Sequence, residues 1–294
     1  MAVIPFPDID PVLIQIGPVA IRWYSLAYVA GLLGAWWFIL RLLRTERLWA
    51  GAPFNGKPSA TADNIGDLFV WAALGVILGG RLGYVLFYGL IYETDHFLSA
   101  PWRIFYAWEG GMSFHGGAIG VVLAIIFFAR AKKLDMVALG DLVAVAVPIG
   151  LFTGRMANFI NGELWGRVSD VPWAMVFPSA AFRAPDGTVL SNPARHPSQL
   201  YEAGLEGIVL FAILVVLIYR FNAFRRPGLC IAVFWAGYGL FRTIVELFFR
   251  ENSHQSLGGV ISMGTVLSLL MFAFAAFFFW YSLYRKGPAL QQTT

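Results

Sequence analysis

Long apolar runs, separated by short polar segments, organise this chain. A helix needs roughly 20 mostly apolar residues to cross the hydrocarbon core of a bilayer. Seven runs meet or approach that length: residues 21–42, 65–88, 114–130, 137–154, 201–219, 228–249 and 259–283. Pro148 and Gly150 interrupt the fourth run, which neighbouring helices can accommodate. The small residues of GVILGGRLGYVLF, in the second run, favour close helix packing. The pattern predicts an all-α polytopic membrane protein with seven transmembrane helices.

Composition supports a membrane protein and argues against nucleic-acid binding, an intrachain disulfide and a metal site. Of the 294 residues, 59% are hydrophobic and 13% are charged, whereas a soluble domain carries about 25% charged residues. The net charge of +4 does not indicate nucleic-acid binding, because the few charges cluster in short loops. The single cysteine, Cys230, excludes an intrachain disulfide and a multi-cysteine metal site. The His, Asp and Glu residues show no metal-ligand spacing, so we expect no metal and no cofactor. The N-terminal MAVIPFPDIDP lacks the basic region of a signal peptide.

Lysine and arginine positions predict how the spans are oriented. If seven spans alternate, one side of the membrane receives most of these cations: Arg41, Arg44, Arg47, Lys57, Arg130, Lys132, Lys133, Arg220, Arg225, Arg226, Arg285 and Lys286. Loops rich in Lys and Arg are usually cytoplasmic. We therefore expect the N-terminus outside and the C-terminus inside.

The two longer loops on the opposite side differ in character. Residues 89–113 include Trp102, Phe105, Tyr106 and Trp108, which suit the lipid headgroup layer. Residues 163–200 are the longest non-spanning stretch and are rich in Pro, Gly and Ser. We interpret this stretch as a small extracytoplasmic cap between the fourth and fifth spans. Otherwise we predict a single integral membrane domain over residues 1–294.

Polar side chains gather near the outer ends of the predicted spans. A charge deep in a membrane helix costs at least about 2.5–3.5 kcal/mol on insertion scales, so it is usually paired or functional. Tyr238, Arg242 and Glu246 are spaced by four residues, which places them on one helical face. The others at this depth are Tyr24, Arg81, His115, Arg155 and Asn158. Because arginine is the preferred fork for phosphate oxygens, an arginine-rich cavity here would suit an anionic phospholipid.

Structural roles stay open for each of these residues. Arg242 and Glu246 could form only an ion pair, and Arg81 could snorkel or pair. His115, in a glycine-rich entrance to a helix, could be a satisfied structural histidine. Asp141, near the start of the fourth span, is typical of an acid at a helix N-terminus. Cys230 falls at the opposite end of the sixth span and is interpreted as structural. Convergence at one depth favours a functional site.

Six ordered motifs resemble those of the prolipoprotein diacylglyceryl transferase family. They are IGPVAIRWYSLAY (16–28), GGRLGYVLFY (79–88), GGMSFHGG (110–117), GRMANFINGELWG (154–166), RHPSQLYE (195–202) and GYGLFRTIVELFF (237–249). The resemblance implies a seven-spanning enzyme of the bacterial inner membrane, with its site facing the periplasmic leaflet. The extracytoplasmic cap interpreted above would then be periplasmic. It implies transfer of the diacylglyceryl group of phosphatidylglycerol to the lipobox cysteine of a preprolipoprotein, with loss of glycerol 1-phosphate. This would be the first step of lipoprotein maturation.

The resemblance also implies site residues. Essential or substrate-contacting roles fall on Tyr24, His115, Arg155, Asn158, Gly166, Tyr238 and Arg242. A supporting polar network would include Arg81, Glu163 and Glu246.

The chemistry of the transfer reaction suggests a role for each of these residues. Our hypothesis places the lipid phosphate on Arg155, with Asn158 and Tyr24 orienting the headgroup. Arg242, held by Glu246, would stabilise the leaving group or lower the thiol pKa. His115 is the candidate general base, because neutral imidazole accepts a proton near pH 7. Two alternatives remain: a small-solute or lipid transporter, and a non-catalytic lipid-binding or assembly subunit.

Overall fold

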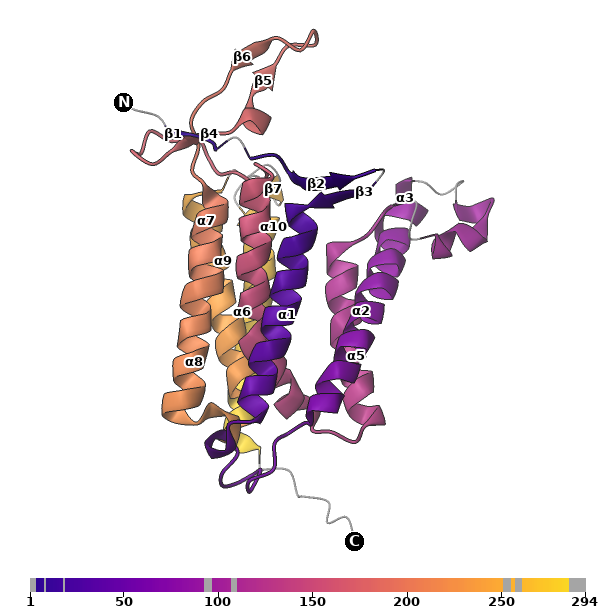
Figure 1. Cartoon of the computed structure of the whole chain (residues 1–294), viewed down its shortest axis with the longest axis vertical. Helices are drawn as coiled ribbons and strands as arrows, with labels where there is room; N and C mark the ends of the chain where they lie inside the picture. The colour runs from indigo at the N-terminus through magenta and orange to yellow at the C-terminus, as the bar shows by residue number, and fades with distance from the viewer. Residues whose placement is uncertain are drawn as a thin grey trace. The chain divides into compact units, whose positions relative to one another are not determined.

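The computed structural model describes residues 4–7, 9–17, 19–92, 97–106, 110–250, 255–256 and 261–285. Within these ranges, six helical segments have the length and apolarity to cross a membrane, and a shorter apolar helix makes the seventh. The prediction of an all-α polytopic membrane protein with seven helices is therefore confirmed (Figure 1). Trp108 and Lys286, used above for the loop and orientation predictions, lie outside the described residues.

The helix bounds follow the apolar runs closely. The spans are α1 (Trp23–Leu43), α2 (Ala62–Tyr84) with π-helical η2 (Val85–Gly89), α5 (Phe114–Ala131), α6 (Met136–Ile160), α7 (Ser198–Glu202) with π-helical η6 (Ala203–Val209) and α8 (Leu210–Phe221), α9 (Leu229–Phe248), and α10 (Met263–Tyr284). Short helices occupy the connections: η1 (Glu46–Leu48), α3 (Leu90–Tyr92), η3 (Pro101–Phe105), η5 (Pro178–Ala180) and η7 (Ala223–Arg225). The largest difference is α6, which continues six residues beyond the predicted end at residue 154. The polar residues of its last turns hid this extension, because the prediction followed apolarity alone.

The described chain forms two compact units. Within the described residues, unit 1 comprises the parts of 4–39 and 141–285, and unit 2 comprises the parts of 40–140. The prediction of a single membrane domain stays a prediction.

Glycines set the packing of α2 against α5 in unit 2. A Cβ added to Gly75 would lie 2.5 Å from the carbonyl oxygen of Gly120. A Cβ added to Gly83 would lie 2.7 Å from Gly116 Cα. The two backbones are therefore in direct contact, as the small residues of the second run predict.

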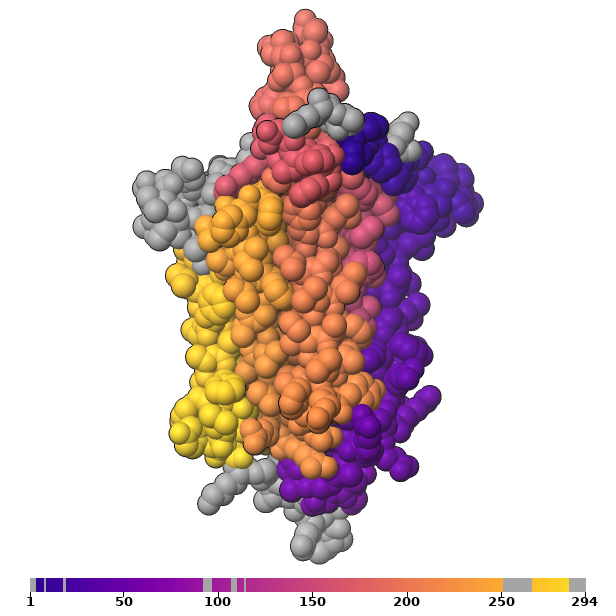
Figure 2. Space-filling view, turned by 90° about the vertical axis from the view of Figure 1, so that its left-hand side faces the viewer, coloured from indigo at the N-terminus to yellow at the C-terminus, as the bar shows by residue number. Residues whose placement is uncertain are grey.

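A buried carboxylate joins α6 to α9 in unit 1. Asp141, only 1% exposed, accepts hydrogen bonds from the backbone N–H of Gly228 at 2.7 Å and of Ile231 at 2.9 Å. These groups belong to the first turn of α9, whose positive end a carboxylate stabilises. Asp141 thus serves the N-terminus of another helix rather than its own, which begins five residues earlier at Met136. Beyond this contact, α8, α9 and α10 pack side by side (Figure 2).

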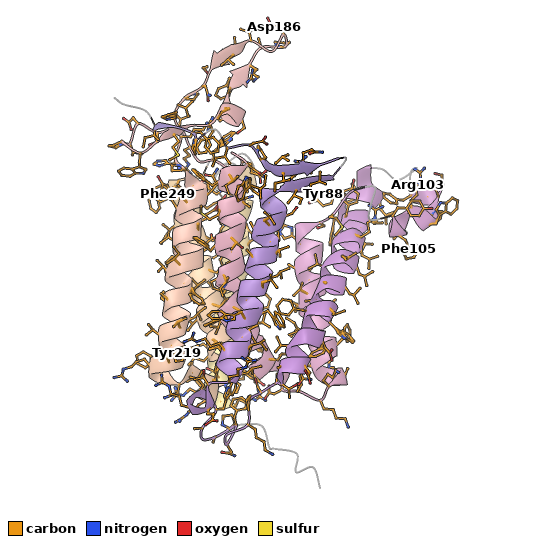
Figure 3. All side chains as sticks on the ribbon, in the orientation of Figure 1. Tyr88, Arg103, Phe105, Asp186, Tyr219 and Phe249 are labelled. Carbon is orange, nitrogen blue, oxygen red and sulfur yellow. The ribbon has the colours of Figure 1, made fainter. Side chains whose placement is uncertain are left out.

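A cap of short strands and loops, residues 163–197, follows α6. Strand β4 (Met175–Val176) pairs in parallel with β1 (Ile4–Pro5), so the N-terminal segment belongs to the cap. Hairpin β5–β6 (Phe182–Arg183 and Val189–Ser191) extends outward with Asp186 at its tip (Figure 3). The N-terminal β2–β3 hairpin (Val12–Ile16 and Val19–Arg22) leads into α1.

A small aromatic core fastens the cap to the end of α6. Phe177 is fully buried against Phe159 of α6, and Phe6 packs against both rings. The sequence predicted a cap at 163–200 but not the participation of the N-terminal strand.

Candidate active site

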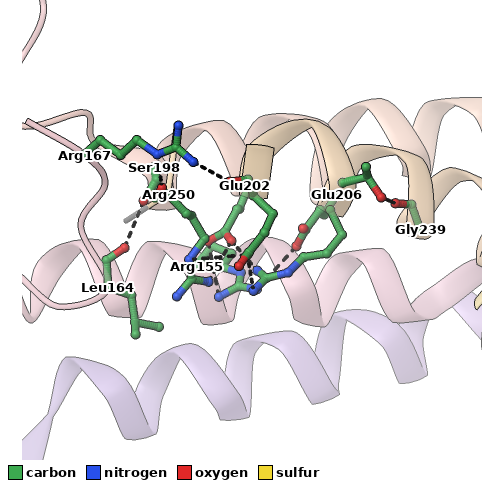
Figure 4. A network of polar contacts seen from close by, with 11 residues as sticks. Arg155, Leu164, Arg167, Ser198, Glu202, Glu206, Gly239 and Arg250 are labelled. Atoms are coloured by element: carbon green, nitrogen blue, oxygen red, sulfur yellow. Dashed lines mark hydrogen bonds and ion pairs between the residues drawn. The ribbon is translucent and has the colours of Figure 1, made fainter. Parts of the chain in front are cut away.

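An arginine–glutamate cluster lies at the cap end of unit 1 (Figure 4). Its members come from α6, the α7–η6 segment, and α9 with the two residues that follow it: Arg155, Glu202, Glu206, Arg242, Glu246 and Arg250. Glu202 is the centre of the cluster, because all three arginines contact its carboxylate. The nitrogen–oxygen distances are 3.3 Å from Arg155, 2.5 Å from Arg242 and 3.2 Å from Arg250.

The other two glutamates complete the cluster. Glu206 Oε2 is 3.4 Å from Arg155 Nη2. Glu246 Oε2 is 3.2 Å from Arg242 Nη2 and 3.9 Å from Arg250 Nε. The predicted i,i+4 pair between Arg242 and Glu246 is therefore present, although the shorter contact of Arg242 goes to Glu202.

Burial makes the accessible side of the cluster cationic. The side chains of Glu202 and Glu206 have no exposed surface, whereas those of Arg155, Arg242 and Arg250 are 15%, 17% and 19% exposed. The Glu246 side chain is 11% exposed, so the three arginines supply the larger share of the accessible surface of the cluster. Guanidinium groups fixed in this way suit a phosphate, because their planar fork of N–H donors matches its oxygens.

The loop after α6 is organised around Glu163. Its Oε1 accepts from Asn158 Nδ2 at 2.8 Å and from Asn161 Nδ2 at 3.5 Å. Gln199 Nε2, from the start of α7, donates to the Glu163 carbonyl at 2.5 Å. These bonds explain why an apolar helix ends in asparagines: their amides hold the following carboxylate in place.

Two tyrosines adjoin the cluster. Tyr24, in the first turn of α1, lies within electrostatic range of Arg155 and Glu163, and its hydroxyl is 3.2 Å from that of Tyr28. Tyr238, from α9, stacks on Phe234 at 5.8 Å and lies within electrostatic range of four cluster members: Arg155, Glu202, Glu206 and Arg242. The structure thus brings Tyr24, Arg155, Asn158, Glu163, Tyr238, Arg242 and Glu246 into one neighbourhood.

Gly166 serves backbone packing in this arrangement. A Cβ at this position would overlap the carbonyl oxygen of Phe249 and lie 2.9 Å from His196 Cβ. Its N–H donates to the His196 carbonyl at 2.9 Å. The next residue, Arg167, donates through Nε to the Arg250 carbonyl at 2.5 Å and through Nη2 to the Glu246 carbonyl at 3.4 Å. The cap therefore holds the end of α9 that carries Glu246 and Arg250.

A separate chain of hydrogen bonds ends at His196. Trp173 Nε1 donates to the Tyr201 hydroxyl at 2.7 Å, and that hydroxyl is 3.0 Å from His196 Nδ1. The indole N–H can only donate, so the Tyr201 oxygen accepts from Trp173, while the direction of its hydrogen bond with Nδ1 depends on the tautomer of His196. Burial and the nearby Arg167 charge both lower the pKa of His196, which agrees with a neutral ring.

The two remaining predicted residues, Arg81 and His115, belong to unit 2. Arg81 is 5% exposed and donates to the carbonyls of Arg103, Ile104, Gly110 and Gly111 at 2.6, 3.0, 2.6 and 3.3 Å. It therefore holds the loop that leads to α5.

His115 is exposed in the first turn of α5. The turn is capped by Ser113, whose hydroxyl accepts from the Gly116 N–H at 3.2 Å.

The sequence interpretation missed three cluster members: Glu202, Glu206 and Arg250. A signal existed for the glutamates, because two acids four residues apart inside an apolar run carry the same insertion cost as the flagged arginines. Arg250 follows the last predicted span and looked like an ordinary loop cation. Among the described residues, no group of three or more His, Cys, Asp or Glu side chains is placed to hold a metal ion.

Within the described residues, seven apolar helices and a largely buried arginine–glutamate cluster define a polytopic membrane protein with a charged polar cluster among its helices. The family described as prolipoprotein diacylglyceryl transferase matches residues 11–281. Relatives named phosphatidylglycerol–prolipoprotein diacylglyceryl transferase include one from Rhizobium leguminosarum bv. trifolii, which is 52% identical over 91% of this chain and 90% of the relative. Another, from Sinorhizobium medicae, is 49% identical over 92% and 91%. The chain belongs to the prolipoprotein diacylglyceryl transferase family and is a transferase of lipoprotein biosynthesis.

Proposed function

We propose that the arginine–glutamate cluster is the site at which this enzyme takes the diacylglyceryl group from phosphatidylglycerol. The acceptor is the lipobox cysteine thiol of a preprolipoprotein. The observation that carries this assignment is that Arg155 and Arg242, whose side chains are 15% and 17% exposed, both contact Glu202, whose side chain has no exposed surface. The names of the relatives support both substrates.

The reaction exchanges one bond to a glycerol carbon for another. The cysteine sulfur forms a thioether bond to the carbon of the diacylated glycerol that carries the phosphate. The bond between that carbon and the phosphate oxygen breaks. The bonding electrons leave with the oxygen, so glycerol 1-phosphate departs with added negative charge. The thiol proton passes to a base, because the thiolate is the nucleophile and a free cysteine has a pKa near 8.5.

Arg155 and Arg242 stabilise the departing charge in this proposal. Glu202 fixes both guanidinium groups before substrate arrives, so they need not reorganise during the reaction. Loss of one preorganised donor of this kind elsewhere costs about 2.7–4 kcal/mol, or roughly 10²–10³ in kcat. Asn158, Tyr24 and Tyr238 orient the headgroup, while Glu163 and Glu246 position Asn158 and Arg242. Gly166 allows the cap to approach α9, and Arg81 positions the loop before α5.

His115 is our candidate general base. It is exposed at the beginning of α5, and neutral imidazole can accept the thiol proton near pH 7. The His115→Gln variant should lose activity, because an amide cannot take up the thiol proton. Retained activity with an unchanged pH–rate profile would remove this assignment.

The loop charges support a membrane orientation for the proposal. The N-terminus and cap would face the periplasm, the C-terminus the cytoplasm, and the site the periplasmic leaflet of the inner membrane. Cysteine-accessibility labelling of Asp186→Cys in the cap hairpin tests this orientation, using Cys230→Ala as background. Labelling only after permeabilisation of the inner membrane would contradict it.

One assay separates this activity from transport and from passive lipid binding. Purified protein is incubated with phosphatidylglycerol and a lipobox peptide, and peptide mass and released glycerol phosphate are measured. Arg155→Ala and Arg242→Ala should each lose at least about 100-fold in rate. Arg225→Ala, an exposed arginine of η7, is the matched control.

Cys230→Ala should also keep full activity, because Cys230 is buried among the first residues of α9. Full activity of Arg155→Ala or Arg242→Ala would refute the site assignment. Absence of any peptide mass gain in the unmodified protein would refute the transfer reaction itself.

A further inference from the structure

A separate cavity lies in unit 2, where α1 ends and α2 begins. Its volume is about 470 Å³, and none of its lining residues belongs to the arginine–glutamate cluster. Apolar side chains of Leu40, Leu43, Pro58 and Ala60 form most of its wall. A volume of this size is typical of small-ligand sites, which range from about 300 to 1,000 Å³.

The loop that completes the cavity has its own buried core. Trp49 is 1% exposed and donates through Nε1 to the Leu42 carbonyl at 3.0 Å. Its ring packs edge-on against Phe54 at 5.1 Å, and its carbonyl accepts from the Gly56 N–H at 2.8 Å. This core fixes the loop against the end of α1, so the cavity exists before a ligand binds.

The polar groups of the cavity favour an anion. Arg44 and Lys57 line it from opposite ends of the loop, and no carboxylate lines it. In the described part of the chain, neither cation makes a side-chain hydrogen bond or ion pair. Thr61 Oγ1 accepts from the Asn64 N–H at 3.2 Å, which leaves the hydroxyl proton to donate.

A neighbouring hydroxyl adds an independent observation. The Ser59 Oγ atom, between lining residues Pro58 and Ala60, is buried and has no hydrogen-bond partner within the described residues. Buried polar atoms are nearly always satisfied. An oxygen-rich ligand in the cavity would bring hydrogen-bonding groups, directly or through water, to this region.

The position of the cavity selects a lipid rather than a free anion. It lies at the ends of two helices long enough to span a membrane, which places it at the level of lipid headgroups. Beyond Ala62 at its edge, the exposed apolar side chains of Val70 and Leu74 lie on the same face of α2, eight and twelve residues further along. An acyl chain can follow this face while the headgroup occupies the cavity.

We propose that this cavity binds the phosphate headgroup of an anionic phospholipid. The Arg44 and Lys57 side chains contact the phosphate oxygens, and Thr61 donates one hydrogen bond. The volume accommodates a headgroup but not two acyl chains, which remain in the bilayer. The bound lipid would anchor the connection between α1 and α2 at one membrane face.

Photolabelling of the purified full-length protein tests this site. The probe is phosphatidylserine with a diazirine on its headgroup, and the adduct is located by peptide mapping. Labelling should fall within residues 40–62 and should be competed by unlabelled phosphatidylserine but not by phosphatidylcholine. Each basic residue near an anionic membrane surface contributes on the order of fivefold in affinity. In the double variant Arg44→Gln/Lys57→Gln, about 25-fold more unlabelled phosphatidylserine should therefore be needed to compete with the probe.

Two further variants separate the cavity from general surface charge. Arg130→Gln/Lys133→Gln removes the same charge from exposed residues at and just beyond the end of α5 and should weaken competition much less than Arg44→Gln/Lys57→Gln does. Ala62→Trp keeps every charge but fills the cavity, and it should abolish labelling of residues 40–62.

Three outcomes would overturn the proposal. Equal competition by phosphatidylcholine would exclude selection for anionic lipids. Competition by inorganic phosphate at equal concentration would make the site one for free anions. An equal loss in both double variants, or full labelling in Ala62→Trp, would show that surface charge and not the cavity selects the lipid.

Discussion

Replacing Glu202 by glutamine should disable the enzyme without weakening lipid binding. Glu202 is fully buried and contacts three arginines at 2.5–3.3 Å. Removing its charge leaves Arg155, Arg242 and Arg250 with only Glu206 and Glu246, so one buried positive charge becomes uncompensated. Breaking a buried ion pair by removing one partner typically costs 3–5 kcal/mol. We therefore expect Glu202→Gln to destabilise the protein by about 3–5 kcal/mol.

The catalytic effect should appear in kcat rather than in KM. Without Glu202, the guanidinium groups lose the contact that fixes their spacing, and a misplacement of about 1 Å can cost 100-fold in rate. The extra positive charge still attracts the lipid phosphate. Glu202→Gln should thus lower kcat by about 100-fold while the KM for phosphatidylglycerol stays level or falls.

Thermal unfolding in detergent and steady-state kinetics with a lipobox peptide provide the two measurements. Glu246→Gln should have the smaller effect, because its carboxylate is partly exposed and its contacts are longer, at 3.2 and 3.9 Å. Asp186→Asn, at the exposed tip of the cap hairpin, is the charge-matched control. A raised KM with unchanged kcat in Glu202→Gln, or a larger loss in Glu246→Gln, would refute the central role of Glu202.

Three further predictions concern stability and are measured by thermal unfolding in detergent. Asp141→Ala should lower the free energy of unfolding by about 1.5–3 kcal/mol for each charged hydrogen bond that is lost. The control Asp67→Asn removes an exposed ion pair at 2.7 Å and should lower it by less than about 1 kcal/mol. Equal effects of the two substitutions would contradict the link between α6 and α9. Gly79→Ala would place a Cβ 2.8 Å from Gly120 Cα and should cost about 1–3 kcal/mol, while Gly66→Ala, with open space around it, should be neutral or stabilising. The pKa of His196 is lower in the folded protein, so on acidification the unfolded chain binds a proton at this residue before the folded protein does. The stability that the neutral ring provides above about pH 6.5 should therefore be lost as the pH falls through the folded pKa. A His196→Asn variant whose stability has the same dependence on pH would contradict this.

The spans and part of the site could be predicted from the sequence because both depend on local pattern. Apolar runs of membrane length define helices whatever their neighbours, and the spacing of Arg242 and Glu246 fixes their contact within one helix. The close packing of α2 and α5 followed from glycine spacing in the same way.

The rest depended on contacts between distant segments. Glu202 of α7 became the centre of the cluster only because α6 brings Arg155 to it, and α9 with the residues after it brings Arg242 and Arg250. Asp141 looked like an acid of its own helix because its partner lies 87 residues away. The two-residue strand β1 is too short to leave a pattern, and its partner β4 lies about 170 residues further along. The role of His115 stays a prediction, since it depends on how its unit meets the cluster.

The pairing of β1 with β4 constrains the order in which the protein can be completed. Ile4 and Pro5 are synthesised first, yet their partners Met175 and Val176 emerge only after α6 has been made. Until then the opening segment has no strand beside it, and closing so long a loop slows assembly. The cap therefore cannot close around its N-terminal strand until α6 has been made.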